Sequence, residues 1–460
     1  MASSSQPSIS SEFRPRLPFP QIPSPTEYHQ EKSANPFLTP YASQDPSRNT
    51  SSAALNQGVA TQRYFQSRRV KKGEIERPWT KVKDPKEKWV TIIPLIGMLV
   101  GFMIAGYMIW DGLQTVVNHK YCPVYMSDFP NKGWEADIWT KEAEVGGFGN
   151  GQFEETTVTT ENVFIQDGML RIKPTLQDPS LIEKNSMINL QAEGICTSSL
   201  WSNCITGTNT TNGTIANPAK SGRINTKKGA SIKYGRIEVE ARLPAGDWLW
   251  PAIWMLPVKN VYGEWPQSGE IDIVESRGNN YTYPQGGNNI VSSSLHWGPD
   301  SVNDAWWRTN VKRNALHTTF AKQFHTFGLE WSEKYLFTYI DTRLLQVLYT
   351  TFDKEGLWER GHFPEANSNG TKYIDPWSQT GRASTPFDQD FYLIMNVAVG
   401  GTNGWFQDDK NGKPWVDESP NPRKDFWNGR DSWYPTWNQS GEMVVKSVKV
   451  WQQEGYNGCH

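Results

Sequence analysis

Residues 269–275 of this 460-residue chain read Gly-Glu-Ile-Asp-Ile-Val-Glu. The stretch places three acidic residues, Glu270, Asp272 and Glu275, in a run whose other members favour a β-strand. Successive side chains of a strand point to opposite faces, so Glu270 and Asp272 share one face while Glu275 would point to the other. A one-residue β-bulge reverses that alternation. With such a bulge, the sequence predicts all three carboxyl groups on one face.

Carboxyl groups gathered on one face of a curved strand are suited to cleaving glycosidic bonds. Two glutamates whose carboxyls lie roughly 5 to 5.5 Å apart can act as nucleophile and acid/base in a retaining reaction. Because adjacent carboxylates repel one another, one should hold its proton at neutral pH, and we expect that one to be Glu275. The alternative is a solvated acidic strand face, which the intervening apolar residues disfavour.

The acidic strand resembles the signature of the family 16 glycoside hydrolases. That signature, Glu-x-Asp-x-x-Glu with a bulge, is typical of their laminarinase-like branch, which also contains β-1,3-glucan-recognition proteins. Residues 233–239 and 243–257 resemble the strand and loop that precede the catalytic strand in this branch. Residues 294–298 and 395–401 resemble strands that flank its cleft. In total, the resemblance covers roughly residues 130–455.

The resemblance implies a role for each acidic residue. Glu270 would be the nucleophile, Glu275 the general acid and then base, and Asp272 a residue that orients and modulates both. It implies a retaining endo-β-glucanase, hydrolase or transglycosylase, that prefers β-1,3-linked glucan. The alternative is a non-catalytic glucan-binding receptor or lectin. Such relatives typically lack one or more of the three acids, and this chain has them all.

Tryptophan is unusually abundant, with 22 in the chain. Flat indole faces stack on the apolar faces of pyranose rings, and a cleft can hold a polysaccharide in this way. Trp250 and Trp254 lie in the matched segment 243–257, and Trp405 closely follows the segment 395–401. We therefore take these three as candidate sugar contacts, with packing in the core as the alternative for each.

Three polar residues near the matched segments have two interpretations each. His296 is either a satisfied core residue or, as the resemblance implies, a neighbour of the acid/base. Asn396 lies in an apolar run and must find partners, either backbone groups or sugar hydroxyls, and the resemblance favours the cleft. Arg277 could contact substrate or neutralise the acidic residues, and we favour neutralisation.

Composition argues against several other functions. The net charge of −2 gives no reason to expect a nucleic-acid partner. The seven histidines show no paired metal-ligand spacing and the chain contains no Cys-x-x-Cys motif, so we expect neither a metal nor a cofactor.

The N-terminal part predicts a membrane anchor. Residues 1–88 begin with a Ser-, Pro-, Gln- and Asn-rich segment that we expect to be a disordered cytoplasmic tail. Residues 89–110 carry no charge and are long enough, at ~1.5 Å per residue, to cross a ~30 Å hydrocarbon core as a helix. A cleaved signal peptide is the alternative, which the long preceding segment disfavours.

Flanking charge predicts a single-pass type II orientation. Nine lysines and arginines lie between residues 68 and 88, against one in residues 111–130, and the positive side stays cytoplasmic. Residues 111–130 would then form a stalk. Residues 131–455 would form a catalytic domain on the lumenal or extracellular side, in the secretory pathway or at the cell surface.

Cysteines and glycosylation sequons agree with this orientation. Four cysteines, Cys122, Cys196, Cys204 and Cys459, all follow the apolar segment. Of three possible pairings we favour Cys196 with Cys204 and Cys122 with Cys459, with free thiols as the alternative. Five sequons also follow it, at Asn209, Asn212, Asn280, Asn369 and Asn438.

The fold prediction rests on many short alternating segments separated by Gly, Pro, Asn and Asp turns. This pattern is typical of an all-β protein. With the family resemblance it implies a concanavalin A-like β-sandwich jelly roll, in which a concave sheet carries the cleft. We expect residues 193–220 to be a loop insertion.

Overall fold

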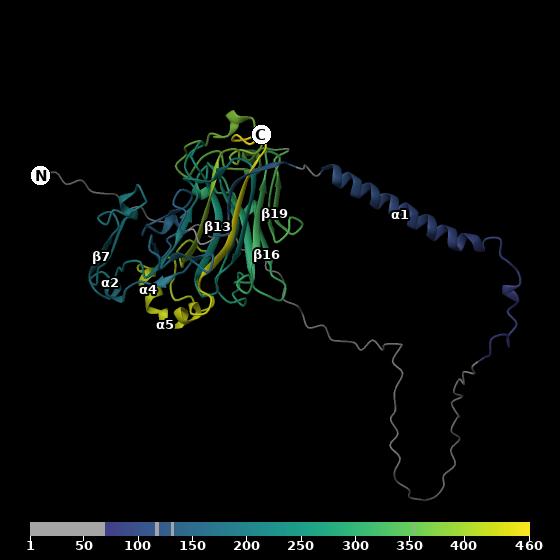
Figure 1. Ribbon diagram of the computed structural model, residues 1–460, viewed down its shortest axis with the longest axis horizontal. Coiled ribbons are helices and arrows are strands. Elements are labelled where there is room, and N and C mark those ends of the chain that lie inside the picture. Colours follow the sequence, from purple (N-terminus) through teal and green to yellow (C-terminus); the bar gives the residue numbers. More distant parts are fainter. Residues whose placement is uncertain (1–69, 116–118, 130–132, 354) are drawn as a thin grey trace, which may run out of the picture. The chain divides into compact units, whose positions relative to one another are not determined.

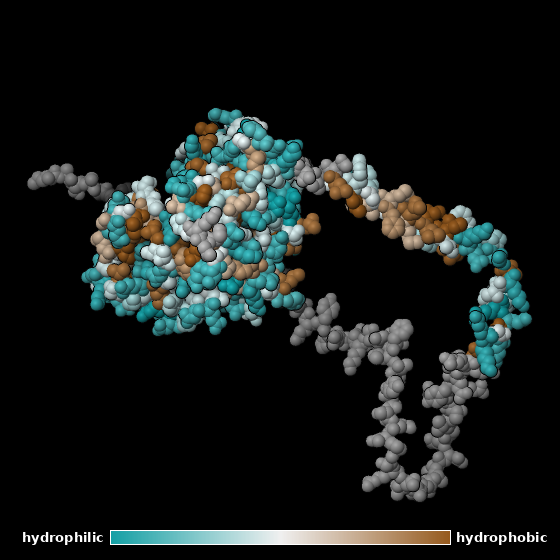
Figure 2. Space-filling view, in the orientation of Figure 1, coloured by the Kyte–Doolittle hydropathy of each residue, from teal (hydrophilic) through white to brown (hydrophobic). Residues whose placement is uncertain are grey.

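The computed structural model describes residues 70–115, 119–129, 133–353 and 355–460. The predicted disordered tail lies mostly outside these ranges. Within them, the first long element is helix α1 (Glu87–Thr115), which contains the whole of the predicted segment 89–110. Its stretch of 27 residues from Glu87 to Leu113 is long and apolar enough to cross a membrane, and its surface is largely apolar (Figure 2). The membrane anchor and its orientation stay predictions.

The β-domain is a sandwich of two eight-stranded sheets (Figure 1). We call the sheet that contains the acidic strand the acid sheet. Its strands, in order across the sheet, are β16 (Asn310–Asn314), β15 (Ile290–His296), β14 (Glu270–Ser276), β13 (Leu249–Pro257), β20 (Phe391–Val399), β10 (Arg223–Asn225) and β2 (Thr140–Lys141), and β11 (Ser231–Ile232) also pairs with β20. All of these pairings are antiparallel.

The second sheet, which we call the supporting sheet, is also antiparallel. Its strands, in order, are β19 (Gln346–Thr351), β18 (Tyr335–Ile340), β17 (His325–Trp331), β12 (Gly235–Arg242), β21 (Met443–Gln453), β5 (Met169–Ile172) and β4 (Val163–Gln166), and β1 (Tyr121–Ser127) also pairs with β21. In β12 the buried and half-buried residues alternate strictly, as expected for a strand with one face on a core.

A single apolar core joins the two sheets. It includes Ile253 and Met255 of the acid sheet and Val239 and Leu329 of the supporting sheet, all at most 1% exposed. All nine residues of β20 are buried, because this strand lies at the centre of the acid sheet and its other face is covered too. The all-β sandwich that the sequence predicts is therefore the observed architecture, and the core leaves one face of the acid sheet for polar side chains.

Smaller elements surround the sandwich. The minor strands are β3 (Glu154–Thr156), β6 (Thr175–Leu176) and β9 (Ala219–Ser221) in one sheet, and β7 (Ser186–Asn189) and β8 (Ile205–Thr208) in another. The short helices are α2 (Pro179–Glu183), α3 (Leu357–Gly361), α4 (Pro422–Asn428) and α5 (Arg430–Trp433). The 3-10 turns are η1 (Pro78–Thr80), η2 (Gly147–Gly149), η3 (Trp201–Asn203), η4 (Ser301–Asn303), η5 (Trp306–Arg308), η6 (Ser378–Thr380) and η7 (Tyr434–Trp437).

Two predicted boundaries differ from the structure. Strand β1 lies inside the segment 111–130 that was expected to be a stalk, because seven of its residues join the supporting sheet beside β21. The expected loop insertion 193–220 contains strand β8, which pairs with β7 in a two-stranded sheet. In both cases pairing with another strand supplies the hydrogen bonds that order a short segment.

Both predicted disulfides are present. Cys122 is bonded to Cys459 across 337 residues of sequence, and Cys196 is bonded to Cys204 across eight. The described residues contain no free cysteine. The five asparagines of the predicted sequons are all exposed, so each is accessible to modification.

Candidate active site

The acidic strand contains the predicted bulge. Asp272 of β14 pairs with Ser294 of β15, and Glu275 pairs with Ser292. Between these two pairs, β14 has two residues and β15 has one. On the other side, the neighbouring residues Ile253 and Trp254 of β13 pair with Val274 and Asp272, which skips Ile273. The extra residue reverses the alternation, as predicted, and puts all three acids on the face that points away from the core.

Each of the two glutamates accepts one indole N–H. Trp265 Nε1 lies 2.7 Å from Glu270 Oε2, and Trp250 Nε1 lies 3.0 Å from Glu275 Oε1. Asp272 lies between them and is only 2% exposed. An indole N–H donor of this kind fixes the direction of a carboxylate.

Burial raises the pKa of all three carboxyl groups. The pKa of Glu270 rises to about 8, through burial and then through the charge of Asp272, whose own pKa rises to about 6 through burial and the charge of Glu275. The pKa of Glu275 is raised by burial and lowered by His296 and the Trp250 hydrogen bond. Burial therefore favours the protonated form of each carboxyl, and the repulsion between Glu270 and Asp272 adds to this effect. That Glu275 holds the proton stays a prediction.

His296 lies between two aspartates. Its Nε2 is 3.1 Å from Asp272 Oδ2, and its Nδ1 is 2.5 Å from Asp304 Oδ2. Burial lowers its pKa, but the charges of Glu270 and Asp272 and the two hydrogen bonds raise it well above 6.5. Asp304 also accepts the backbone N–H groups of Trp297 and Trp306. His296 is thus partly buried beside the acids, and its surroundings favour its cationic form.

Glu270, Asp272 and His296 are also the group of described residues that could hold a metal ion, since their ligand atoms lie within 4.8 Å of one another. A histidine can bind a metal only through a ring nitrogen without a proton. His296 Nδ1 is hydrogen-bonded to Asp304 Oδ2, and the raised pKa of the imidazole favours its cationic form, which offers a metal no free nitrogen.

Trp250 and Trp405 form a stacked pair beside Glu275. Their ring centroids are 4.6 Å apart and their planes differ by 12°. The guanidinium carbon of Arg277 lies 3.9 Å from the Trp405 ring centroid, on the face opposite Trp250. Both faces of Trp405 are therefore covered, and Trp250 is only 7% exposed. This differs from the expectation that both rings stack on sugar, because protein side chains occupy the faces that sugar would need.

Trp254 and Asn396 lie further along the same sheet face. Trp254 Nε1 donates to Asn396 Oδ1 at 2.7 Å, so the buried amide has a side-chain partner rather than a backbone one. The guanidinium of Arg223 lies 4.8 Å from the Trp254 ring centroid and 4.0 Å from that of Phe148. Trp254 remains partly exposed and stays a candidate sugar contact.

The structure brings two further tryptophans to the acids. Trp265 is 43% exposed and its ring centroid lies 5.6 Å from that of His296. Trp306 is 44% exposed and lies 6.4 Å from His296 on the same measure. Both combine an open ring with a position beside the acids, and the sequence analysis missed them. The dipeptide Trp265-Pro266, four residues before the acidic strand, was the one available signal.

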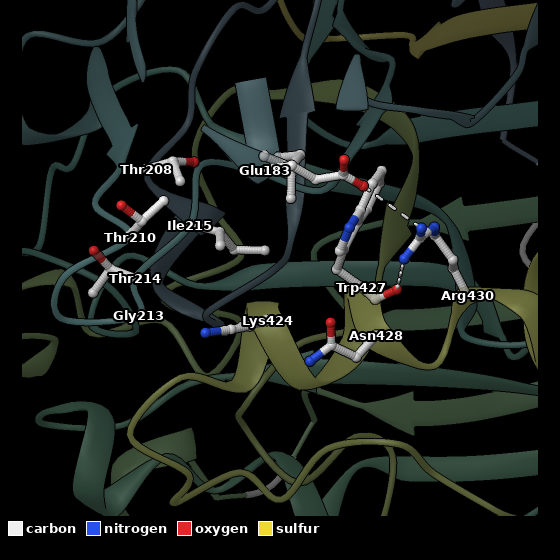
Figure 3. Close-up of a pocket in the computed structure, with 11 residues that line it drawn as sticks. Glu183, Thr208, Thr210, Gly213, Thr214, Ile215, Lys424, Trp427, Asn428 and Arg430 are labelled. Atoms are coloured by element: carbon white, nitrogen blue, oxygen red, sulfur yellow. Dashed lines mark hydrogen bonds and ion pairs between the residues drawn. The ribbon is translucent and has the colours of Figure 1, made fainter. Parts of the chain in front are cut away.

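A hollow of about 280 Å³ is lined by residues other than the three acids (Figure 3). It is formed by α2, the segment 208–215, α4 and α5. Arg430 reaches across it, with Nη2 3.6 Å from Glu183 Oε1 and Nη1 donating to the carbonyl oxygen of Trp427 at 3.2 Å. Glu183 is its only acidic lining residue, so this hollow lacks the carboxyl pair that the chemistry requires.

Comparison with known proteins identifies the family. The family model for glycosyl hydrolases family 16 matches residues 189–379. The β-1,3-glucan-binding protein of Penaeus monodon is 38% identical over 333 residues, which are 69% of this chain and 87% of that protein. The chain belongs to glycosyl hydrolase family 16.

Proteins with other names are also similar to this chain. Glucan endo-1,3-beta-glucosidase A1 of Niallia circulans is 32% identical over 55% of this chain, but the match spans only 29% of that protein. Among solved structures, the laminarinase from Rhodothermus marinus aligns with a TM-score of 0.44 at 24% identity, over 73% of this chain and 99% of that chain. The names of the relatives similar in sequence thus include both a β-1,3-glucan-binding protein and a glucan endo-1,3-beta-glucosidase.

Proposed function

We propose that this chain is a retaining endo-acting β-glucanase, hydrolase or transglycosylase, whose substrate is β-1,3-linked glucan. The observation that carries the proposal is the bulged strand β14, which gathers Glu270, Asp272 and Glu275 on one sheet face. An indole N–H on each glutamate and a cationic His296 complete the set. The names of the Penaeus and Niallia relatives support β-1,3-glucan as the polymer.

The proposed reaction has two steps. In the first, a carboxylate oxygen of Glu270 bonds to the anomeric carbon as the bond to the glycosidic oxygen breaks, and that oxygen takes the proton of Glu275. In the second, water or a sugar hydroxyl attacks the anomeric carbon, Glu275 takes its proton, and Glu270 leaves. Water gives hydrolysis and a sugar hydroxyl gives transfer, with the same configuration at the anomeric carbon.

The position of the shared proton controls the rate. The first step requires Glu270 ionised and Glu275 protonated, and burial raises the pKa of both groups, so that one of them can keep a proton near neutral pH. A second proton would neutralise the nucleophile and loss of the shared proton would remove the acid, so the pH–rate profile should be bell-shaped.

The test is release of reducing ends from laminarin by the full chain and by Glu270→Gln. We expect the wild type to release them and the variant to lose turnover while keeping its circular dichroism spectrum. Glu418→Gln, at an exposed glutamate, is the matched control and should behave as the wild type. Normal turnover by Glu270→Gln would refute the assignment of the nucleophile. Mass spectrometry with an added acceptor oligosaccharide then separates transfer from hydrolysis.

The second candidate function is glucan binding without cleavage. The name of the Penaeus relative favours it. In that case the wild type would be retarded by laminarin in affinity electrophoresis but would release no reducing ends. Glu270→Gln would then bind as the wild type does, since no reaction is lost.

We also propose the type II membrane orientation for this enzyme. The apolar helix α1, the two disulfides and the five exposed sequons support it. In sealed microsomes, protease should remove the N-terminal tail and leave the β-domain intact, and the protected fragment should shift in mass on deglycosylation. Protection of the tail would reverse the proposed orientation.

A further inference from the structure

Arg277 is a buried cation without an acidic partner. It is 7% exposed, and among the residues that the structure describes no carboxylate lies within ion-pair distance of it. Instead Nε and Nη2 both donate to the carbonyl oxygen of Trp405, at 3.0 and 2.7 Å. Buried charges are normally paired, because removing one from water is costly. Arg277 thus forms no ion pair with the acids, but its charge still acts on Glu275, in agreement with the neutralising role that the sequence favoured.

Aromatic rings take the place of an ion pair. The guanidinium carbon lies 3.9 Å from the ring centroid of Trp405, 5.7 Å from that of Tyr283 and 6.0 Å from that of Phe406. A cation over an indole face is attracted by the ring's negative face, and more strongly when water is excluded. The Trp405 Nε1 is buried without a hydrogen-bond partner. Contacts to the two ring faces and hydrogen bonds to the backbone carbonyl oxygen of Trp405 therefore hold this residue in place.

The contacts continue from Trp405 to the acid/base. Arg277 covers one face of Trp405, the other face stacks on Trp250, and Trp250 Nε1 donates to Glu275 Oε1. We propose that Arg277 is a positioning residue that fixes the Glu275 carboxyl group through Trp405 and Trp250 and biases its ionisation through its own charge. This inference rests on the proposed function, in which Glu275 is the general acid.

The charge of Arg277 acts on a defined set of groups. Glu275 faces Glu270 and Asp272 on its own strand, His296 from β15 and Arg277 beyond the bulge. Burial raises the pKa of Glu275, whereas His296 and Arg277 lower it. Removing the arginine charge should therefore raise that pKa. The alkaline limb of the pH–rate profile, where the acid loses its proton, should then move to higher pH.

The test uses two substitutions that separate charge from shape. Arg277→Met keeps the length but removes charge and donors, and Arg277→Lys keeps the charge but not the planar fork. We expect Arg277→Met to lower kcat roughly 10- to 100-fold with a smaller change in KM, because the acid is misplaced while no substrate contact is lost. Its alkaline limb should move upward, and that of Arg277→Lys should stay in place.

A second readout does not depend on turnover. Stacked indoles give an exciton couplet in circular dichroism, and Trp405→Leu identifies the contribution of this pair. Arg277→Met should lose the couplet and shift the carboxyl titration of Glu275 measured by NMR. The control is Arg242→Met, in which the lost guanidinium lies 5.7 Å from the ring centroid of Phe324, on the supporting sheet. Neither readout should change in this control.

The outcomes distinguish the two proposals. A wild type without turnover refutes the enzyme, while loss of the couplet and a shifted Glu275 titration in Arg277→Met still support the positioning role. An Arg277→Met protein with the wild-type couplet, Glu275 titration and alkaline limb overturns the inference. If Arg277→Met does not fold, Arg277→Lys decides: it should weaken the couplet, and an unchanged couplet overturns the inference.

Discussion

The indole N–H of Trp265 donates to Glu270 Oε2 over 2.7 Å, while the Trp265 ring remains 43% exposed. One side chain therefore orients the proposed nucleophile and also offers an open aromatic face beside it. A sugar stacked on that face would lie next to the Glu270 carboxyl group. In the proposed reaction, Trp265 therefore couples sugar binding to the attack of Glu270.

Glu275→Ala should separate the two halves of the reaction. Without its general acid, kcat/KM on laminarin should fall roughly 10²- to 10⁴-fold, and much less on an aryl glycoside whose leaving group needs no proton. Azide should restore turnover of the aryl glycoside and give a glycosyl azide of the β configuration, measured by NMR. An equal loss on both substrates would contradict the assignment of Glu275.

Glu270→Gln should change the pH dependence of stability. The folded-state pKa of Glu270, about 8, lies above its ordinary value of 4.5. The folded state therefore binds the Glu270 proton more tightly than the unfolded state does. The bound proton stabilises the fold fully below pH 4.5, and this stabilisation is lost as pH rises through 8. The variant has no such proton. The difference in Tm between the variant and the wild type should therefore change in favour of the variant by roughly 2 to 4 °C from pH 5 to pH 8.5.

The control for that measurement is Glu418→Gln, on the surface. Its Tm difference from the wild type should be the same at both pH values. Other buried acids with raised pKa values, such as Glu154 at about 7, are present in every variant and cancel in the differences. A Glu270→Gln difference that does not vary with pH would contradict the buried, protonated state of Glu270.

Asp304→Asn should lower the pKa of His296, because it removes a charge from the hydrogen bond to Nδ1. The positive charge of His296 lowers the pKa values of Glu270 and Asp272, so these values should rise when His296 loses charge. The acidic limb of the pH–rate profile should therefore move to higher pH. NMR titration of the imidazole measures the first effect directly. An unchanged titration would show that Asp304 does not hold His296 in its charged form.

The matched control is Asp300→Asn. Asp300 caps the same loop by accepting the backbone N–H groups of Val302 and Asn303, at 3.0 and 2.9 Å. It has no described contact with His296. Loosening of the loop alone would therefore affect both variants, whereas the electrostatic effect should be confined to Asp304→Asn.

Trp306→Ala should weaken glucan binding. Its ring is 44% exposed beside His296, and loss of one stacking face costs about 1 to 2 kcal/mol, or roughly tenfold in affinity. Calorimetry with a β-1,3-gluco-oligosaccharide on a Glu270→Gln background measures this without turnover. Trp201→Ala is the control, because Trp201 is 69% exposed within the disulfide-bridged segment 196–204. An equal loss of affinity in both variants would contradict the assignment of Trp306 as a sugar contact.

The acidic strand was predictable because its spacing is a local property. Glu270 and Glu275 are five residues apart, and only a bulge can bring both to one face of a strand. The disulfide between Cys196 and Cys204 was favoured for a similar reason, since the two lie close in sequence. The structure confirms the bulge and the disulfide.

The residues that support the acids could not be predicted in the same way. Asp304 and Trp306 lie in a loop after β15, and they reach His296 only because that loop folds back. The stacking of Trp405 on Trp250 joins residues 155 positions apart, and Arg277 closes it from a third segment. An exposed indole and a stacked one look alike in the sequence, so sugar contacts and supports could not be told apart.

Strand β1 and the Cys122–Cys459 disulfide determine how the β-domain resists a mechanical load. Cys122 is the second residue of β1. A force applied to the chain on the N-terminal side of β1 therefore acts on the disulfide within two residues of the start of the strand. The antiparallel ladder with β21 shares that tension among many hydrogen bonds. A load applied from that side would therefore act on the disulfide and on the β1–β21 hydrogen bonds together, before it reached the rest of the supporting sheet.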